Sequence, residues 1–246
     1  MNRLKQHSTQ LASLVAVVLL WEVMARVLDS SGFPPASQVV VVFGEIIGDG
    51  SAFGPLGSTL FRTVLGFLLG FSVGVAYGIF VFLSRVFDQL SRGLFQIAMF
   101  TPTLILIFLS LIMLGRNNLT VILLIGFAIS TDVGVYIRDA LKDFDPGLVH
   151  MAKSYKVTLG ERIKGAYLPF LIPPMLAAAR IGFTLAWKVA FLSEVFGFPE
   201  GLGWQVRTSY SIYDMTSLLA WLTVFVVTLL IVEQVIRQIE RAVVKW

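Results

Sequence analysis

Long apolar runs dominate this sequence and limit what the chain can fold into. Hydrophobic residues make up 57% of the 246 positions and charged residues only 14%, whereas a soluble domain is about half apolar and about a quarter charged. A helix needs about 20 apolar residues to cross a bilayer, so this length holds about six spans with short loops. The sequence therefore predicts an all-α polytopic membrane protein with a single domain over residues 1–246. The expected spans are 11–28, 59–83, 93–114, 119–137, one that begins near 170, and 218–236.

Basic residues are distributed unevenly between the segments that connect these runs. With residue 1 on the inner side, thirteen Lys and Arg residues fall on the inner side and four on the outer side. Cytoplasmic loops collect Lys and Arg, so we expect both termini and the segment 143–169 in the cytoplasm. This distribution also accounts for the net charge of +4 without a nucleic acid partner. The four outer residues are Arg26, Arg62, Arg116 and Arg207.

Sequence motifs of enzymes and metal sites are absent. The chain has no Cys and only two His, too few for a thiolate site or a histidine metal cluster. No Gly-x4-Gly-Lys-Ser/Thr motif occurs, so the chain has no P-loop to hold ATP. Neither His-Glu-x-x-His nor Gly-x-Ser-x-Gly is present. We therefore expect no catalysis and no cofactor in this chain.

The segment 143–169 contains an amphipathic pattern. Its apolar residues recur at i, i+3, i+4, i+7 and i+11, which predicts one stripe along a short helix. Such a helix between two spans lies on the lipid surface, docks into a groove of a partner, or merely connects the spans. The stripe consists of Leu148, Met151, Ala152, Tyr155 and Leu159.

The same segment resembles the cytoplasmic loop of permeases of binding-protein-dependent ABC importers. That loop reads Glu-Ala-Ala, three residues, Gly, nine residues, Ile, one residue, Leu-Pro. Here the register runs from His150 to Pro169. Ala152, Leu168 and Pro169 match, while His150, Met151, Lys156 and Ala166 replace the Glu, Ala, Gly and Ile. Further segments that resemble the nitrate, sulfonate, taurine and bicarbonate type of this family are the elbow 33–39, 101–103, 179–182 and 201–203.

This resemblance implies a particular assembly. A homodimer of the chain would work in a bacterial inner membrane with two ATPase subunits inside, which bind the ATP, and a solute-binding protein outside. The segment 143–169 would carry the coupling helix that sits in a groove of the ATPase. The loop with Gly201, Leu202 and Gly203 would lie outside, where the binding protein docks. The residues expected to couple to the ATPase are Leu148, His150, Met151, Ala152, Tyr155, Lys156 and Leu159.

Shorter patterns predict local features. Four glycines spaced four residues apart leave one face of the second span bare, which predicts close packing against another helix. Arg62 is expected to extend toward the membrane interface from the end of the same span. Pro102 is expected to kink a single helix over 93–114, because proline frees a backbone carbonyl. Glu22 and Arg26, four residues apart, are expected to pair. The glycines are Gly66, Gly70, Gly74 and Gly78.

The fifth span combines charged and aromatic residues on one helix face. At about 100° per residue, five of them fall within a sector about 80° wide, and Lys188 lies beside it. The opposite face, from Ala178 to Ala190, is small and apolar and suits close packing. Because lipid disfavours charge, the polar face is expected either to line the translocation path together with Asp132, or to form structural pairs with Asp132, helix ends or backbone. The five residues are Arg180, Thr184, Trp187, Phe191 and Glu194.

The substrate and the transport class stay open at this point. Arg180 and Lys188 favour a small anion such as a sulfonate, nitrate, taurine or bicarbonate. Trp187 and Phe191 instead suit a neutral or aromatic vitamin precursor. A stand-alone secondary carrier would use Asp132 as its ion-coupling residue, but the chain shows no convincing internal repeat.

Overall fold

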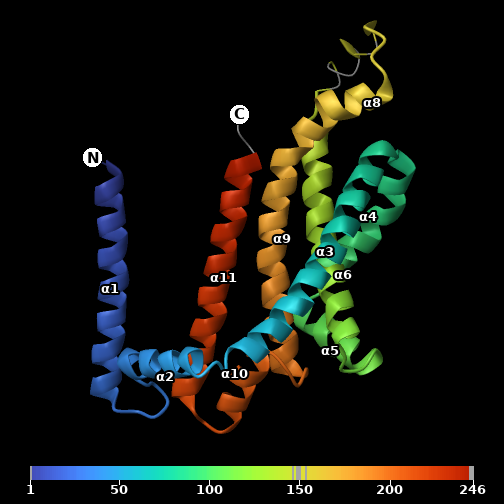
Figure 1. Cartoon of the computed structure of the whole chain (residues 1–246). Coiled ribbons are helices and arrows are strands. Elements are labelled where there is room, and N and C mark those ends of the chain that lie inside the picture. Colours follow the sequence, from blue (N-terminus) through green and yellow to red (C-terminus); the bar gives the residue numbers. More distant parts are fainter. Residues whose placement is uncertain (1, 146, 148–150, 153, 244–246) are drawn as a thin grey trace.

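A computed structural model describes residues 2–145, 147, 151–152 and 154–243, without the side chains of residues 2–11, 159, 163 and 243. The described part is helical and contains no strand (Figure 1), which confirms the all-α class. In chain order its elements are α1 Asn2–Leu28, α2 Ala36–Gly48, α3 Phe53–Leu83, α4 Arg85–Phe100, α5 Thr103–Met113, α6 Asn118–Lys142, α8 Leu159–Arg162, the π-helical turn η1 Ile163–Tyr167, α9 Leu168–Phe196, α10 Leu202–Ser211 and α11 Met215–Val243.

Four stretches have the length and composition of a membrane span. They are α3, α6, the continuous segment Gly160–Phe196 that contains α9, and α11. The pair formed by α4 and α5 passes the same test as one broken span, which makes up to five among the described residues. The sequence predicted six. The 27-residue helix α1 covers the position of the first predicted span. Within the described residues, however, it is not among the helices that are long and apolar enough to count as a membrane span.

The third predicted span is broken rather than kinked. α4 and α5 meet at an angle of 96°, where Thr101 has an extended backbone and Pro102 precedes the first turn of α5. The residue before a proline is driven out of the helical region, and proline itself lacks an N–H. The prediction of one kinked helix is therefore wrong, and Pro102 ends one helix and starts another.

Close packing of α3 on α6 forms the centre of the bundle. A Cβ added at Gly70 would lie 2.6 Å from the Gly126 carbonyl oxygen, and one at Gly74 would lie 2.9 Å from that of Ser130. Gly66 and Gly78 approach side chains of α6 in the same way. The predicted role of the glycine row in helix packing is confirmed, because only residues without a side chain permit this approach.

The small face of α9 packs against the same centre. Ala178, Gly182, Ala186 and Ala190 are buried, and Gly182 lies against Ile129 and other side chains of α6 and α3. This confirms the packing predicted for the small face. The remaining faces of α9 are therefore the ones available for polar side chains.

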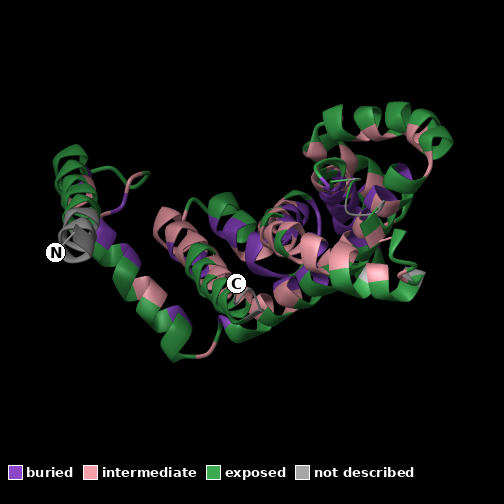
Figure 2. Cartoon of the chain, turned by 90° about the horizontal axis from the view of Figure 1, so that it is seen from above, coloured by how far each residue is buried: buried purple, intermediate pink, exposed green. Residues whose placement is uncertain are grey.

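Helix α1 stands apart from the bundle (Figure 2), whereas α2 packs on it, with Val39 and Ile46 buried in one cluster with Trp187 and Trp221. Glu22 and Arg26 pair at 2.6 Å, as predicted. The Ser37 hydroxyl donates to Glu22 at 2.9 Å and ties the start of α2 to α1. Figure 1 places the start of α1, the end of α11 and α8 at one end of the molecule, and α2 and α10 at the other end, called here the α10 end.

Candidate functional site

A buried ion pair joins α3 to α9 at the α10 end. Arg62 Nη2 lies 2.5 Å from Glu194 Oε1, and the two side chains are 1% and 0% exposed. Thr59 Oγ1 and the backbone N–H of Gly203 both donate to Glu194 Oε2 at 2.9 Å. Such a pair is favourable only when further hydrogen bonds satisfy the charged groups, as they do for this carboxylate. The prediction that Arg62 extends to the membrane interface is wrong, because Glu194 supplies a counter-charge inside the protein.

The same ion pair holds the loop that leads into α10. Arg62 Nη2 donates to the carbonyl of Glu200 at 3.2 Å, and the N–H of Leu202 donates to Thr59 Oγ1 at 2.9 Å. Gly201 has a φ of +100°, and a Cβ there would clash with the Glu194 carboxylate. Spans α3 and α9 and the start of α10 are thus fixed to one another at this end.

The aromatic part of the predicted polar face of α9 is turned toward α11. Trp187 is 0% exposed, and its ring stacks on Phe225 with centroids 5.3 Å apart. Its Nε1 donates to the Phe225 carbonyl at 3.3 Å. Phe191 packs on the same ring with centroids 4.2 Å apart. Both aromatic rings therefore have a partner within the chain.

The charged residues of α9 lie in different surroundings. Arg180 Nη1 is 3.9 Å from Glu240 Oε2 on α11, and both side chains are partly exposed. Thr184 Oγ1 donates to the Arg180 carbonyl at 3.0 Å within the helix. Lys188 is exposed and has no hydrogen bond or ion pair within the described residues. The predicted face is thus divided between α11, the buried pair with Arg62, and an open side that carries Lys188.

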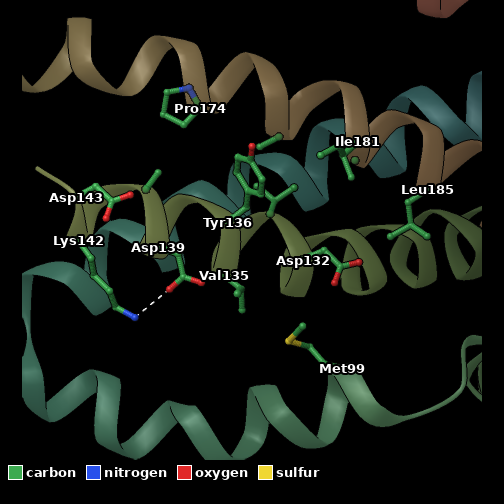
Figure 3. Close-up of a pocket in the computed structure, with 14 residues that line it drawn as sticks. Met99, Asp132, Val135, Tyr136, Asp139, Lys142, Asp143, Pro174, Ile181 and Leu185 are labelled. Carbon is green, nitrogen blue, oxygen red and sulfur yellow. Dashed lines mark hydrogen bonds and ion pairs between the residues drawn. The ribbon is translucent and has the colours of Figure 1, made fainter.

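Asp132 lines a cavity on the open side of α6. The cavity has a volume of about 800 Å³ and lies between α6, α9 and Met99 of α4 (Figure 3). One interpretation of the polar face of the fifth span was that Arg180 or Glu194 pairs with Asp132. The structure shows neither pair. Within the part of the chain that the structure describes, the Asp132 carboxylate has no hydrogen bond or ion pair. From α6 the cavity is lined by Asp132, Val133, Val135, Tyr136, Asp139, Ala140, Lys142 and Asp143, and from α9 by Pro174, Ala178, Ile181, Gly182 and Leu185.

Part of the predicted coupling segment is described. Met151 and Ala152 are helical, and the side chains of Met151 and Tyr155 are 55% and 79% exposed. Leu148 and His150 lie outside the described residues, as does the side chain of Leu159. The coupling role of all these residues stays a prediction. The exposed surface of Met151 and Tyr155 is consistent with a contact to another protein.

The predicted single helix to Leu159 is interrupted. The chain turns at Lys156, which has a φ of +54°, and α8 begins only at Leu159. Thr158 Oγ1 accepts from the N–H of Glu161 at 3.4 Å, while Glu161 accepts from the N–H of Thr158 at 2.9 Å. This reciprocal pair is a capping box, whose Thr-x-x-Glu pattern marks a new helix start in the sequence.

Two groups of site residues were not found by sequence reasoning. Thr59 and Gly203 both donate hydrogen bonds to Glu194. Thr59 lies 135 positions from Glu194, so no local pattern connects the two. Gly203 lies only nine positions away, but it belongs to another helix, α10, and helical periodicity does not extend across the loop between the two helices. Tyr136 and Asp139 line the cavity with Asp132. For these a signal exists, because the spacing i, i+4 and i+7 places them on one face of α6.

A helical bundle with several spans, a charged cavity between them and a buried anchor at one end defines a polytopic membrane transport subunit. The chain belongs to the family described as binding-protein-dependent transport system inner membrane component, which matches residues 64–245. It is 24% identical over 232 residues to the putative aliphatic sulfonates transport permease SsuC of Bacillus subtilis, covering 94% of this chain and 84% of that protein. It is 22% identical to the taurine transport permease TauC of Escherichia coli over 98% and 90% of the two chains.

The fold also has a solved counterpart. A chain from the inward-facing MetNI methionine ABC transporter superposes with a TM-score of 0.67 at 20% identity, covering 78% of this chain and 95% of that one. The protein is therefore a multi-pass, non-catalytic permease subunit of an ABC importer. Permeases of this class work with ATPase subunits and binding proteins.

Proposed function

We propose that the chain forms the translocation path for a small organic anion of the sulfonate class. The observation that carries this proposal is Lys188, an exposed cation within a span that has no partner in the described residues. A charged side chain inside a span is costly and typically marks a substrate path. The similarity to an aliphatic sulfonates permease and to a taurine permease agrees with an anionic substrate.

The proposed assembly contains two copies of the chain, two ATPase subunits and one solute-binding protein. The end that carries the start of α1, the end of α11 and α8 faces the cytoplasm, in agreement with the excess of Lys and Arg on that side. The ATPase contacts the exposed side chains of Met151 and Tyr155. The binding protein docks at the α10 end, where the ion pair of Arg62 and Glu194 holds the docking surface rigid.

Two other transport functions receive less support. A neutral aromatic solute would need free aromatic surface, but the rings of Trp187 and Phe191 both pack on Phe225. A secondary carrier would need no ATPase, whereas the family is that of binding-protein-dependent systems. Asp132 is then available for a role in the importer itself.

Uptake in proteoliposomes tests the proposed function. The chain is reconstituted with its ATPase and binding protein, and uptake of 2-aminoethanesulfonate and of ethanesulfonate is measured with and without ATP. We expect uptake of at least one sulfonate that requires both ATP and the binding protein. Uptake driven by an ion gradient without ATP would establish the secondary carrier instead. ATP-dependent uptake of a neutral aromatic solute, with no uptake of sulfonates, would overturn the anion class.

A further inference from the structure

We propose that a second pocket, between α4 and α6 at the end of the molecule that carries α8, binds the phosphate headgroup of an anionic phospholipid. The pocket has a volume of about 410 Å³. It shares Met99, Val135 and Lys142 with the cavity at Asp132 but is also lined by Arg92 and Arg138. Lipid binding at this pocket does not depend on which solute the chain transports.

Three cations from two helices line the pocket. Arg92 lies on α4, and Arg138 and Lys142 lie one turn apart near the end of α6. Among the described residues that line the pocket, none is a carboxylate. The neighbouring cavity instead has three carboxylates, among them Asp132. An anion is therefore attracted to the pocket and repelled by the cavity beside it.

The three cations keep hydrogen-bond donors that a phosphate group can use. Arg138 directs both Nε and Nη2 to Asp139 Oδ1 at 2.9 Å, while its Nη1 has no acceptor among the described residues. Lys142 Nζ donates to the same oxygen at 2.9 Å and has two further N–H groups. Arg92 pairs with Asp88 through Nη2. Two carboxylates thus offset three cations, which leaves one net positive charge beside the free donors.

The order of charged and apolar side chains in the pocket matches that of a phospholipid. On α6, Val135 lies seven residues before Lys142, which is about 10 Å along the axis, and on α4 Met99 follows Arg92 by the same number of residues. α4 starts near α8 and leads away from it, whereas α6 ends near α8 (Figure 1). On both helices the cations therefore lie toward the α8 end and the apolar residues lie deeper. Figure 3 shows Met99 on the side of Val135, away from Lys142.

This spacing fits the depth of a lipid headgroup. The headgroup layer of one leaflet is about 5–8 Å thick, so a lipid whose phosphate contacts the cations has its acyl chains at the depth of Met99 and Val135. Phe100, another lining residue, is 82% exposed, so this part of the pocket opens toward the surrounding lipid. Basic pockets between spans bind anionic headgroups on the cytoplasmic side of a membrane, where the proposed orientation puts this end.

Lipid binding to the purified full-length chain tests the inference. After delipidation in detergent, the chain is titrated with dioleoyl phosphatidylglycerol or dioleoyl phosphatidylcholine, and native mass spectrometry measures the lipid bound per chain. We expect phosphatidylglycerol to bind at least about fivefold more tightly, since one cation near a membrane surface contributes about this factor. Equal affinities for the two lipids would overturn the inference.

Two arginines with the same local pairing distinguish the pocket from a general attraction to the basic end of the molecule. Arg92 pairs with Asp88 and Arg237 with Glu233, each four residues apart on a helix and each arginine about half exposed. Arg92→Gln should weaken phosphatidylglycerol binding about fivefold, whereas Arg237→Gln on α11 should leave it unchanged. Equal effects of the two substitutions would show that the lipid does not bind in this pocket.

A thiol in the pocket identifies what covers it. The chain has no Cys, so Gln96→Cys places a single thiol among the lining residues. We expect phosphatidylglycerol to slow the labelling of this thiol by a maleimide. Inorganic phosphate at the same concentration should have no effect, because it lacks acyl chains. Tyr210→Cys, an exposed position on α10, is the control and should be labelled at the same rate with and without lipid.

Two results of the labelling would overturn the phospholipid. Protection of Gln96→Cys by inorganic phosphate alone would assign the pocket to a free anion. Protection that increases with protein concentration in the absence of lipid would show that a second copy of the chain covers the pocket.

Discussion

Arg62 and Glu194 form an ion pair that is closed to solvent and links two spans 132 residues apart in sequence. Removing one partner of such a pair leaves the other charge buried. We predict that Glu194→Gln destabilises the chain by about 3–5 kcal/mol. Thermal unfolding of the purified chain in detergent measures the loss. The double variant Arg62→Met with Glu194→Leu should recover most of it, because it removes both charges. A single variant as stable as the wild type would contradict this role.

The loop before α10 should tolerate no side chain at Gly201, its last residue. Gly201→Ala would combine a left-handed backbone, φ +100°, with a clash against the Glu194 carboxylate. We expect a loss of about 1–3 kcal/mol in the same unfolding measurement. Gly54→Ala is the control, because a Cβ at Gly54 meets nothing within 4 Å. Equal stability of the two variants would show that the loop is not held by this contact.

The α3–α6 contact should depend on the absence of a side chain at the glycine row. In Gly70→Ala the new methyl group would lie 2.6 Å from the Gly126 carbonyl oxygen, so the helices must separate. A cost of about 1–3 kcal/mol is expected for this overpacking. Gly93→Ala lies on α4 in open space and should cost little. The prediction fails if both variants unfold at the wild-type temperature.

Assembly with the ATPase should depend on Tyr155. Its side chain is 79% exposed, and a charge at this position disrupts an apolar contact. We expect Tyr155→Arg to lose co-purification with the ATPase and ATP-driven uptake. Tyr210→Arg, on an exposed side chain of α10 at the opposite end, should retain the ATPase. Normal co-purification of Tyr155→Arg would show that Tyr155 does not lie in the ATPase groove.

The first turn of α11 should become less stable at low pH. Hydrogen bonds from Ser217, first from its side chain and then from its backbone N–H, hold the pKa of Asp214 below its usual value. A lowered pKa means that this stabilisation is complete above about pH 4, the usual value for Asp, and is lost as the pH falls through the folded-state value. The protection of the first turn of α11 against hydrogen exchange, relative to an unfolded chain at the same pH, should therefore fall below about pH 4. Asp214→Asn, which does not titrate, should remove this pH dependence, and an unchanged pH profile would exclude Asp214 as its source.

Much of the architecture follows from local patterns in the sequence. The apolar runs determine the all-α membrane class, because a backbone in lipid must satisfy its hydrogen bonds within each helix. The spacing of Gly66 to Gly78 determines which face of α3 meets another helix, and the small face of α9 is found in the same way. Helical periodicity suffices for these features, since each depends on residues within a few turns.

Pairing between distant segments was decided by the tertiary structure alone. The sequence placed Glu194 on a polar face with Arg180 and Trp187, but the fold gives each a different partner. Glu194 pairs with Arg62 on α3, Arg180 with Glu240 on α11, and Trp187 stacks on Phe225 of α11. The sharp break at Pro102 also depends on the bundle, because a proline permits either a kink or a new helix. Periodicity defines the faces of a helix, whereas the neighbours that cover each face are selected by the packing of the whole bundle.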